Sequence, residues 1–286
     1  MAPYRRPPVA FVTGANQGLG LSLVRTLARQ FGGFGVVYLG ARSAGRGRVA
    51  LGQLRREGLA PFFYQLDVRD GDQVDEAARA VRNRHGGADL VISNAAMRRT
   101  RDASDPETIR AFIDTNNLGA HRMIRAFGPI LNDHGRFLVV ASAFGRLRYL
   151  APELRPRFDT TAMTLDDLEK TLAEYAALVE AGEDQAAGWP ASVNVPSKIG
   201  QVAAVRIMAR DYRDEARRRG ILINAACPGL VDTEASRPWF DDMSTAQSPD
   251  EAAVDVAWLA TRPAGVTEPY GELVQHRVVL GYDAER

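Results

Sequence analysis

The sequence predicts an α/β fold organised around a doubly wound parallel sheet. Short apolar runs alternate along most of the 286 residues with segments whose apolar positions recur at helical spacing. Strands that alternate with helices in this way are typical of a parallel sheet covered by helices on both faces. Neither an internal repeat nor a linker interrupts the pattern. One domain is therefore expected over residues 1–286, with a helical insertion at 146–190 where the alternation stops.

Composition limits the classes of protein to which the chain can belong. A hydrophobic fraction of 45% and a charged fraction of 25% are typical of a globular protein. The formal net charge of +1 gives no reason to expect nucleic acid or a membrane as a partner, and no apolar run reaches membrane-spanning length. The single cysteine, Cys227, excludes an internal disulfide and fits a reducing cytoplasm. The four histidines lack the spacing of ligands, so no metal site is expected.

The most informative stretch runs from Phe11 to Gly20, with the sequence FVTGANQGLG. An apolar run at 9–12 reads as a buried strand, and a helical face with four-residue spacing follows the glycines: Leu19, Leu23, Leu27 and Phe31. Glycines let the backbone turn tightly and approach a pyrophosphate, while the helix N-terminus offers free N–H groups. The segment therefore predicts a nucleotide-phosphate site.

The end of the next strand indicates which dinucleotide is bound. A strand at 35–39 leads into Gly40-Ala41-Arg42, and this end of a dinucleotide fold faces the adenosine ribose. An acid there would bind the 2′-hydroxyl, whereas an arginine would pair with a 2′-phosphate. Arg42 is followed by Arg46 and Arg48 with no acid between them, which favours NADP(H) over NAD(H).

The remaining elements follow from the same patterns. Further strands are expected at 61–66, 90–93, 137–140, 221–226 and 271–275. Further helices are expected at 47–57, around 74–81, from 105, from 164, at 193–217 and from 248. The helix of the insertion begins with a capping-box pattern, Thr164 with Asp167. Three polar residues fall at or near strand ends, where they cost stability unless they are used or satisfied: Asn94, Asn116 and Ser142.

Taken in order, several of these motifs resemble those of a short-chain dehydrogenase/reductase. They are the glycine turn, the Asn94-Ala95-Ala96 strand end, Asn116, Ser142, Lys198 and Pro228-Gly229. The resemblance covers nearly the whole chain and is closest to the monomeric carbonyl reductases, through Gly40-Ala41-Arg42, Gln65-Leu66-Asp67-Val68, Gly188-Trp189-Pro190 and Lys198-Ile199-Gly200. It implies a Rossmann-type fold and reduction of a carbonyl with NADP(H). In that subfamily the insertion covers the face through which other members dimerise, which implies a monomer.

The resemblance also implies a role for individual residues. Cofactor contacts are implied for the glycine turn, namely Gly14, Asn16, Gln17, Gly18, Leu19 and Gly20. On the adenosine side they are implied for Arg42 at the 2′-phosphate, for Asp67 and Val68 at the adenine, and for Asn94 and Ala95. On the nicotinamide side they are implied for Lys198 at the ribose, for Val231 and Thr233 at the carboxamide, and for Pro228 and Gly229. Ser142 would polarise the substrate carbonyl, and Asn116 would belong to a proton relay.

One position departs from the family pattern. The family has a tyrosine four residues before the lysine, and here that position is Asn194. Reduction of a ketone needs a proton for the nascent alkoxide, which the family's tyrosine supplies. A carboxamide has no proton to yield near neutral pH and only donates a hydrogen bond. Loss of a general acid costs about 10²- to 10⁴-fold in rate. Asn194 is therefore a candidate for hydrogen bonding to the carbonyl beside Ser142, with no acid role.

Three interpretations remain open from the sequence. In the first, the protein is an NADPH-dependent ketoreductase, and the proton comes from a water relay through Asn116 and Lys198, from Tyr149, or from the substrate. A substrate hydroxyl beside the carbonyl, as in aromatic polyketides and quinones, would carry its own acid. In the second, the protein binds NADP(H) without turnover and serves as a partner or sensor. In the third, the site catalyses a non-redox cyclisation or isomerisation. The presence of residues for most of the expected binding and catalytic roles favours the first interpretation, the ketoreductase.

Four aromatic residues near these motifs can be read in two ways. They can line an apolar pocket for an aromatic substrate, or they can be packing residues: Phe144, Tyr149, Trp189 and Trp239.

Overall fold

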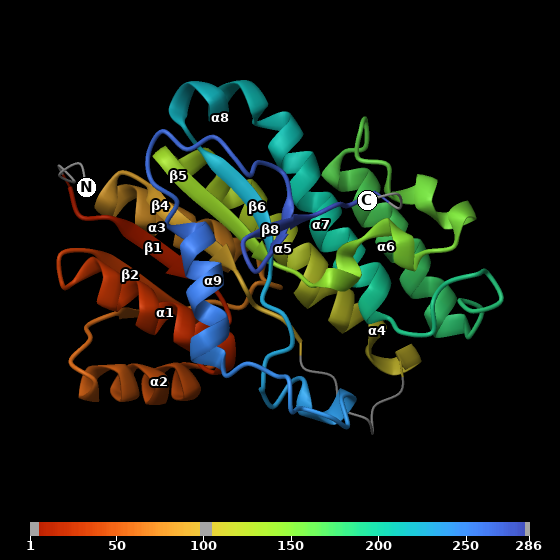
Figure 1. The fold of residues 1–286 in the computed structure, drawn as a ribbon, viewed down its shortest axis with the longest axis horizontal. Coiled ribbons are helices and arrows are strands. Elements are labelled where there is room, and N and C mark those ends of the chain that lie inside the picture. Colours follow the sequence, from red (N-terminus) through yellow and green to blue (C-terminus); the bar gives the residue numbers. More distant parts are fainter. Residues whose placement is uncertain (1–5, 98–104, 284–286) are drawn as a thin grey trace.

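The computed structural model describes residues 6–97 and 105–283 and builds them around one mostly parallel sheet (Figure 1). Its eight strands have the order β3-β2-β1-β4-β5-β6-β7-β8, and only the β7–β8 pair is antiparallel. The strands are β1 Val9–Val12, β2 Val36–Ala41, β3 Phe62–Gln65, β4 Ala88–Ser93, β5 Leu131–Val140, β6 Leu222–Cys227, β7 Leu273–Gln275 and β8 Val278–Leu280. The order reverses between β1 and β4, and ligands of such sheets bind outside the strand ends at this point.

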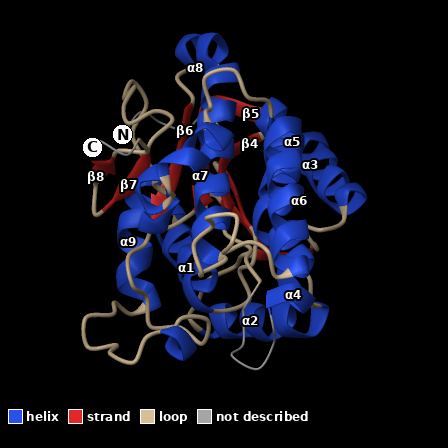
Figure 2. Ribbon diagram, turned by 90° about the vertical axis from the view of Figure 1, so that its right-hand side faces the viewer, coloured by secondary structure: helices blue, strands red, loops and turns tan. Residues whose placement is uncertain are grey.

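Helices cover both faces of the sheet. One face carries α1 (Gly18–Phe31), α2 (Ala44–Arg56) and α9 (Pro249–Ala260), which share a hydrophobic core with β1, β2 and β4 (Figures 1 and 2). The other face carries α3 Gly71–His85, α4 Asp105–Ile113, α5 Gly119–Phe127, α7 Asn194–Asp211 and, outside them, α6 Leu165–Ala181. The α/β fold class and the doubly wound parallel sheet are thus confirmed. No helix in the described ranges is both long and apolar enough to cross a membrane.

Two expectations for the C-terminal half were wrong in detail. The single helix expected at 193–217 is divided into α7 and α8 (Arg213–Arg219) at Tyr212, whose ψ of 3° leaves the helical range. Neither proline nor glycine marks this break in the sequence; in the structure the Tyr212 hydroxyl lies against Gly128, a contact distant in sequence. The single strand expected at 271–275 is a hairpin of β7 and β8, which positive φ angles at His276 and Arg277 allow.

The insertion packs its main helix, α6, against the helices of the sheet. The capping box expected at Thr164 is confirmed, because Thr164 and Asp167 exchange side-chain and backbone hydrogen bonds. The buried face of α6 meets α4 and α7 through Leu168, Leu172, Tyr175, Ala176 and Val179. Trp189 packs on Tyr175 with ring centroids 4.6 Å apart and is almost fully buried, so it belongs to this core and not to a pocket.

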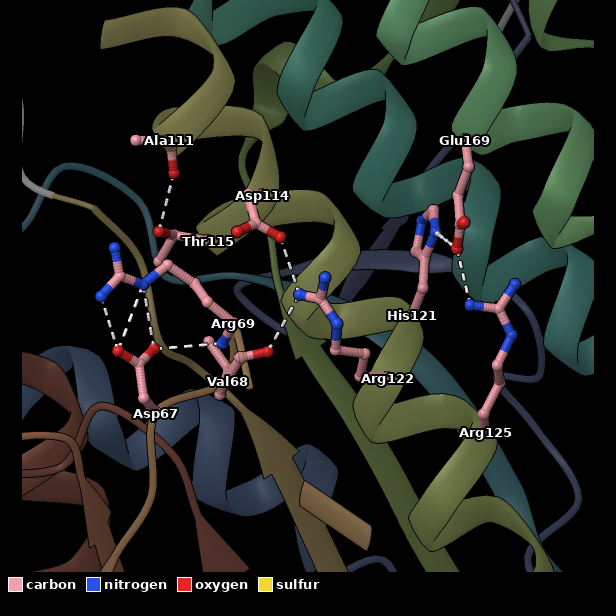
Figure 3. Close-up of polar contacts among 10 residues, drawn as sticks. All are labelled: Asp67, Val68, Arg69, Ala111, Asp114, Thr115, His121, Arg122, Arg125 and Glu169. Carbon is pink, nitrogen blue, oxygen red and sulfur yellow. Dashed lines mark hydrogen bonds and ion pairs between the residues drawn. The ribbon is translucent and has the colours of Figure 1, made fainter. Parts of the chain in front are cut away.

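Ion pairs at the edge of this contact join α6 to α4 and α5. Arg110 of α4 donates to the Glu180 carboxylate through Nε and Nη2, each at 2.5 Å. On α5, Arg125 donates to Glu169 at 2.6 Å, and the buried His121 lies 3.1 Å from the same carboxylate through Nδ1 (Figure 3). His121 Nε2 is buried with no hydrogen-bond partner among the described residues, so the ring proton sits on Nδ1 and is donated to Glu169.

We expect His121 to make the protein less stable as the pH falls from 7 to 5. Burial lowers the pKa of His121 below its usual 6.5, so the unfolded chain binds the proton first and stability is lost below about pH 6.5. Hydrogen bonds from His121 and Arg125 hold the pKa of Glu169 at about 2, so Glu169 adds its own loss of stability only below about pH 4.5.

The variant His121→Gln keeps a hydrogen-bond donor for Glu169 and removes the titration of the imidazole. Measured by urea unfolding, the loss of free energy of unfolding between pH 7 and pH 5 should be smaller in His121→Gln than in the native protein, by up to about 2 kcal/mol. Equal losses in both proteins would contradict this account.

Candidate functional site

The glycine turn between β1 and α1 lies directly against the end of β4. Gly14 has a φ of +62°, and a Cβ atom on it would lie 2.7 Å from Ala95 Cα. A Cβ atom on Gly20 would lie 2.5 Å from both Asn94 Nδ2 and Gly14 O. Only glycine fits at either position, because the backbone has no room to retreat. Helix α1 then begins after Gln17 without a side-chain cap, which leaves its first N–H groups free for a ligand.

Asn94 fastens this turn to the sheet. Its Nδ2 donates to Thr13 O at 2.9 Å and to Gly14 O at 3.2 Å. In return, Thr13 Oγ1 accepts from the backbone nitrogens of Asn94 and Ala95 at 3.0 Å. The carboxyl ends of β1 and β4 are therefore held together at the point where the strand order reverses. The Asn94 side chain shapes the turn through these bonds.

A cavity of about 780 Å³ opens along these strand ends. Among the residues predicted from the sequence, its lining includes Gly14, Asn16, Gln17, Gly18, Leu19, Gly20, Arg42, Asp67, Val68, Asn94, Ala95 and Thr233. Its lining also includes residues that the sequence reasoning did not assign to it: Arg46, Leu66, Ala96, Met97, Thr115, Asp232, Glu234, Ala235, Arg237 and Pro249. Of these, Arg46 was noted beside Arg42, and in the 232–237 loop only Thr233 was predicted, because no motif marks its other residues.

The adenosine end of the cavity, as the resemblance places it, carries positive charge at the end of β2. Arg42 and Arg46 line it and are exposed, and no carboxylate stands between them. Asp67 follows the neighbouring strand β3 and is paired with Arg69 at 2.6 Å, and that bond lowers the pKa of the carboxyl (Figure 3). Val68 O accepts from Arg122, which also binds Asp114 at 2.8 Å (Figure 3). The end of β3 is therefore tied to the helices beside it.

A π-helical turn, η1 (Asp114–Leu118), separates α4 from α5 and carries Asn116. Asn116 Oδ1 accepts from Met97 N at 2.7 Å, so the side chain holds the chain that leaves β4. The backbone oxygen of Asn116 accepts from Gln201 Nε2 at 2.8 Å. Asn117 and Ser197 also bond reciprocally: Asn117 Nδ2 donates to Ser197 O at 2.8 Å, and Ser197 Oγ donates to Asn117 Oδ1 at 2.7 Å. The turn is thus bound firmly to α7.

Lys198 lies on the first turns of α7 and points into the molecule. Its Nζ donates to Gln201 Oε1 at 2.8 Å. Burial lowers the pKa of Lys198 to about 8, and the nearby Cys227 at the end of β6 works in the opposite direction. The turn η3 (Ala143–Gly145), which follows Ser142, lies against the same part of α7, because a Cβ on Gly145 would lie 3.0 Å from Lys198 O. Ser142 therefore belongs to the same end of the sheet as Lys198.

Asn194 is the first residue of α7, one helical turn before Lys198. Pro196, at the third position of the helix, is tolerated there because first-turn N–H groups have no intrahelical partner. Ser142 Oγ accepts from Phe144 N at 3.3 Å. Phe144 and Tyr149 meet edge to face with centroids 5.4 Å apart, and Phe144 is 39% exposed. The Trp239 side chain lies outside what the structure describes.

Comparison with known proteins agrees with this geometry. The model of the family "short chain dehydrogenase" matches residues 8–152. Human "Carbonyl reductase [NADPH] 3" is 34% identical over 278 residues, which are 96% of this chain and 98% of the relative. Rat "Carbonyl reductase [NADPH] 1" is 34% identical over 276 residues, which are 95% and 97% of the two chains. The chain belongs to the short chain dehydrogenase family.

Solved structures of this fold include salutaridine reductase from Papaver somniferum. It superposes with a TM-score of 0.81 at 20% identity and covers 93% of this chain and 99% of its own. Menthone neomenthol reductase from Mentha piperita superposes with a TM-score of 0.76 at 25% identity, over 94% and 98% of the two chains. The predicted membership of this family, close to carbonyl reductases, is confirmed.

Seven residues with predicted roles do not line the cavity. Four of them are described above: Ser142, which directly precedes η3, Asn194 and Lys198 on α7, and Asn116 on the π-helical turn. The other three follow β6: Pro228, Gly229 and Val231. Pro228 O accepts from Gln247 at 3.4 Å, and Val231 bridges to Gln247. The predicted roles of all seven remain predictions for a member of this family.

Proposed function

We propose that this protein is an NADPH-dependent ketoreductase in which Asn194 occupies the place of the family's general acid. The observation that carries the proposal is the combination of a glycine turn at a helix N-terminus, two arginines at and just after the end of β2, and a partly buried lysine one turn after Asn194. The carbonyl reductase relatives, whose printed names include NADPH, support the same assignment. The residues expected to bind and orient the cofactor and the substrate are present. The group that is replaced is the tyrosine phenol, whose place Asn194 takes.

The residues present fit NADP(H). The absence of a side chain at Gly14 and Gly20 lets the turn pack directly against the end of β4, and α1 offers uncapped N–H groups to a pyrophosphate beside it. Arg42 and Arg46 would hold the 2′-phosphate, Asp67 and Val68 would flank the adenine, and Lys198 would hold the nicotinamide ribose. When bound, the cofactor supplies a hydride to the carbonyl carbon. The cavity of about 780 Å³ has the size expected for a dinucleotide site.

The protein's own groups then act on the carbonyl oxygen. Ser142 and Asn194 donate hydrogen bonds to the oxygen, on which negative charge develops as the alkoxide forms. Neither the Asn194 amide nor a serine hydroxyl yields its proton near neutral pH. The alkoxide therefore takes its proton from relayed water or from the substrate. A hydroxyl beside the carbonyl of an aromatic, polyketide- or quinone-like substrate is well suited to this role.

The shorter side chain at position 194 favours a flat substrate. An asparagine is shorter than a tyrosine by several ångströms, so a ring of the substrate would take the place of the missing phenol. The exposed Phe144, packed on Tyr149, offers an aromatic surface next to Ser142. A bulky aromatic ketone would therefore contact Phe144 while its carbonyl meets Ser142.

The proposed enzyme works as a single-domain cytoplasmic monomer with the insertion at 146–190. Support comes from α6, which covers α4 and packs beside α5 with its apolar stripe and three ion-paired contacts (Figure 2). That helical face is the one through which other members of the family would pair.

The experiment that tests the proposed function is a substrate panel with NADPH, followed by loss of its absorbance. The panel contains simple ketones, plain quinones and aromatic ketones that carry a hydroxyl beside the carbonyl. We expect turnover confined to the hydroxylated members, because they bring their own proton. Equal turnover of simple ketones would place the donor in the protein, with Tyr149 and the relay residues next for mutation. Tight NADPH binding without oxidation of any member would favour the binding-only or the non-redox alternative.

Restoring a phenol at position 194 should extend the enzyme to simple ketones. Asn194→Tyr supplies a general acid one turn before Lys198, whose positive charge favours the phenolate. We expect kcat for a simple ketone to rise by about 10²- to 10⁴-fold. Asn194→Phe is the matched control, since it has the same ring without the proton and should give no rise. Equal effects of the two variants would show that ring packing, and not acid catalysis, is what changes.

Arg42→Ala should weaken NADPH binding by about tenfold or more without weakening NADH binding, because only NADPH carries the 2′-phosphate. Arg48→Ala is the control, since Arg48 is exposed on the helix α2 that follows Arg42 and is not part of the cavity lining. Fluorescence titration of each variant with both dinucleotides measures the ratio. A loss of the same size for NADH, or for Arg48→Ala, would contradict the assignment of Arg42.

A further inference from the structure

Gln201 joins the active-site lysine to the π-helical turn. Its side chain is 2% exposed, and both ends of the amide are used. Oε1 accepts from Lys198 Nζ at 2.8 Å, and Nε2 donates to Asn116 O at 2.8 Å. The orientation of the amide is fixed by chemistry, because an ammonium needs an acceptor and a carbonyl needs a donor. Lys198 and the backbone of Asn116 are thus connected by one carboxamide.

The surrounding contacts leave this amide little freedom. Ser197 and Gln201 lie one turn apart on α7 and face the same π-helical turn. The reciprocal bonds between Ser197 and Asn117 hold α7 in register with η1, and all three side chains are fully or almost fully buried. Buried polar groups that are satisfied in this way form a rigid network. A rotation of the Gln201 amide would break a hydrogen bond at each end and leave two buried groups unpaired.

We propose that Gln201 is a positioning residue that fixes Lys198 Nζ to the π-helical turn and closes the route for protons between Lys198 and the Asn116 carbonyl. A carboxamide does not gain or lose a proton in the physiological range, so it cannot pass one on as a water molecule or a hydroxyl does. Lys198 then serves to hold the nicotinamide ribose, and the alkoxide receives its proton from the side of the substrate. This inference rests on the proposed ketoreductase function.

The electrostatics of Lys198 depend on the same bond. Among the described groups, the ionisable neighbour that acts on Lys198 is Cys227, and burial raises the pKa of its thiol. The thiol is therefore neutral near pH 7 and gives the ammonium no counter-charge. Gln201 Oε1 is then the main acceptor that stabilises the charged lysine. Removing that acceptor should favour the neutral amine.

The first test measures the protonation of Lys198 directly and needs no turnover. The chain has two lysines, Lys170 and Lys198, so NMR of protein labelled with ¹³C at lysine Cε gives two resonances, with exposed Lys170 as the internal reference. The Lys198 resonance should titrate with a midpoint of about 8 in the native protein. In Gln201→Leu, which has no acceptor for the ammonium, the midpoint should fall clearly below that of the native protein.

A second variant keeps this test decisive if Gln201→Leu does not fold. Gln201→Glu places a carboxylate against the ammonium and should raise the Lys198 midpoint well above 8. In both variants the Lys170 resonance should keep its native midpoint. An unchanged Lys198 midpoint in either folded variant would overturn the role assigned to Gln201.

The second test asks whether Gln201 closes a proton route. In the Asn194→Tyr background, Gln201→Ala opens a space in which water can link Lys198 to the Asn116 carbonyl, whereas Gln201→Leu fills it with apolar atoms. We expect Gln201→Ala to raise kcat for a simple ketone by about tenfold or more over Asn194→Tyr alone, and Gln201→Leu to give no rise. A loss of similar size in both double variants would mean that Gln201 is only structural. If no variant oxidises NADPH, the proposed function fails, while the NMR titration still decides the role of Gln201.

Discussion

The site depends on the binding of a π-helical turn to the first turns of α7. A π turn adds one residue to a helix, which shifts the backbone groups around it and exposes carbonyls that an α-helix would use internally. Here those shifted groups are bound by α7: Gln201 takes the Asn116 carbonyl and Asn117 pairs with Ser197. Because Lys198 lies between the two contacts on α7, the same bonds that hold the turn also set the position of its ammonium group.

The insertion supports this arrangement from the outside. Helix α6 packs an apolar stripe against α4 and α7, and its Glu180 pairs with Arg110. Glu169 of the same helix contacts His121 and Arg125 (Figure 3). These partners lie on the helices directly before and after the π turn. The turn is therefore bound directly by α7, and α6 supports the two helices that flank it.

Local patterns in the sequence predicted the parts of the site that are built locally. The glycine turn, the arginine at the end of β2 and the capping box at Thr164 each depend on residues a few positions apart, and spacing alone specifies them. The role of Gln201 could not be predicted in this way, because it depends on a π turn more than eighty residues earlier in the chain. The break at Tyr212 and the burial of Trp189 were hidden for a similar reason: each residue makes a contact distant in sequence, with Gly128 and Tyr175 respectively.

The two unusual residues of the site point to one chemical conclusion. In the proposed mechanism Asn194 takes the place of the proton donor, and Gln201 lies between Lys198 and the π turn. Both are carboxamides, which make hydrogen bonds and do not transfer protons near neutral pH. If these proposed roles hold, the site suits a substrate that protonates itself. The proposed selectivity for hydroxylated ketones would then come from the chemistry of the substrate as much as from its shape. A ketone without an internal acid can bind, but it has no proton for its alkoxide.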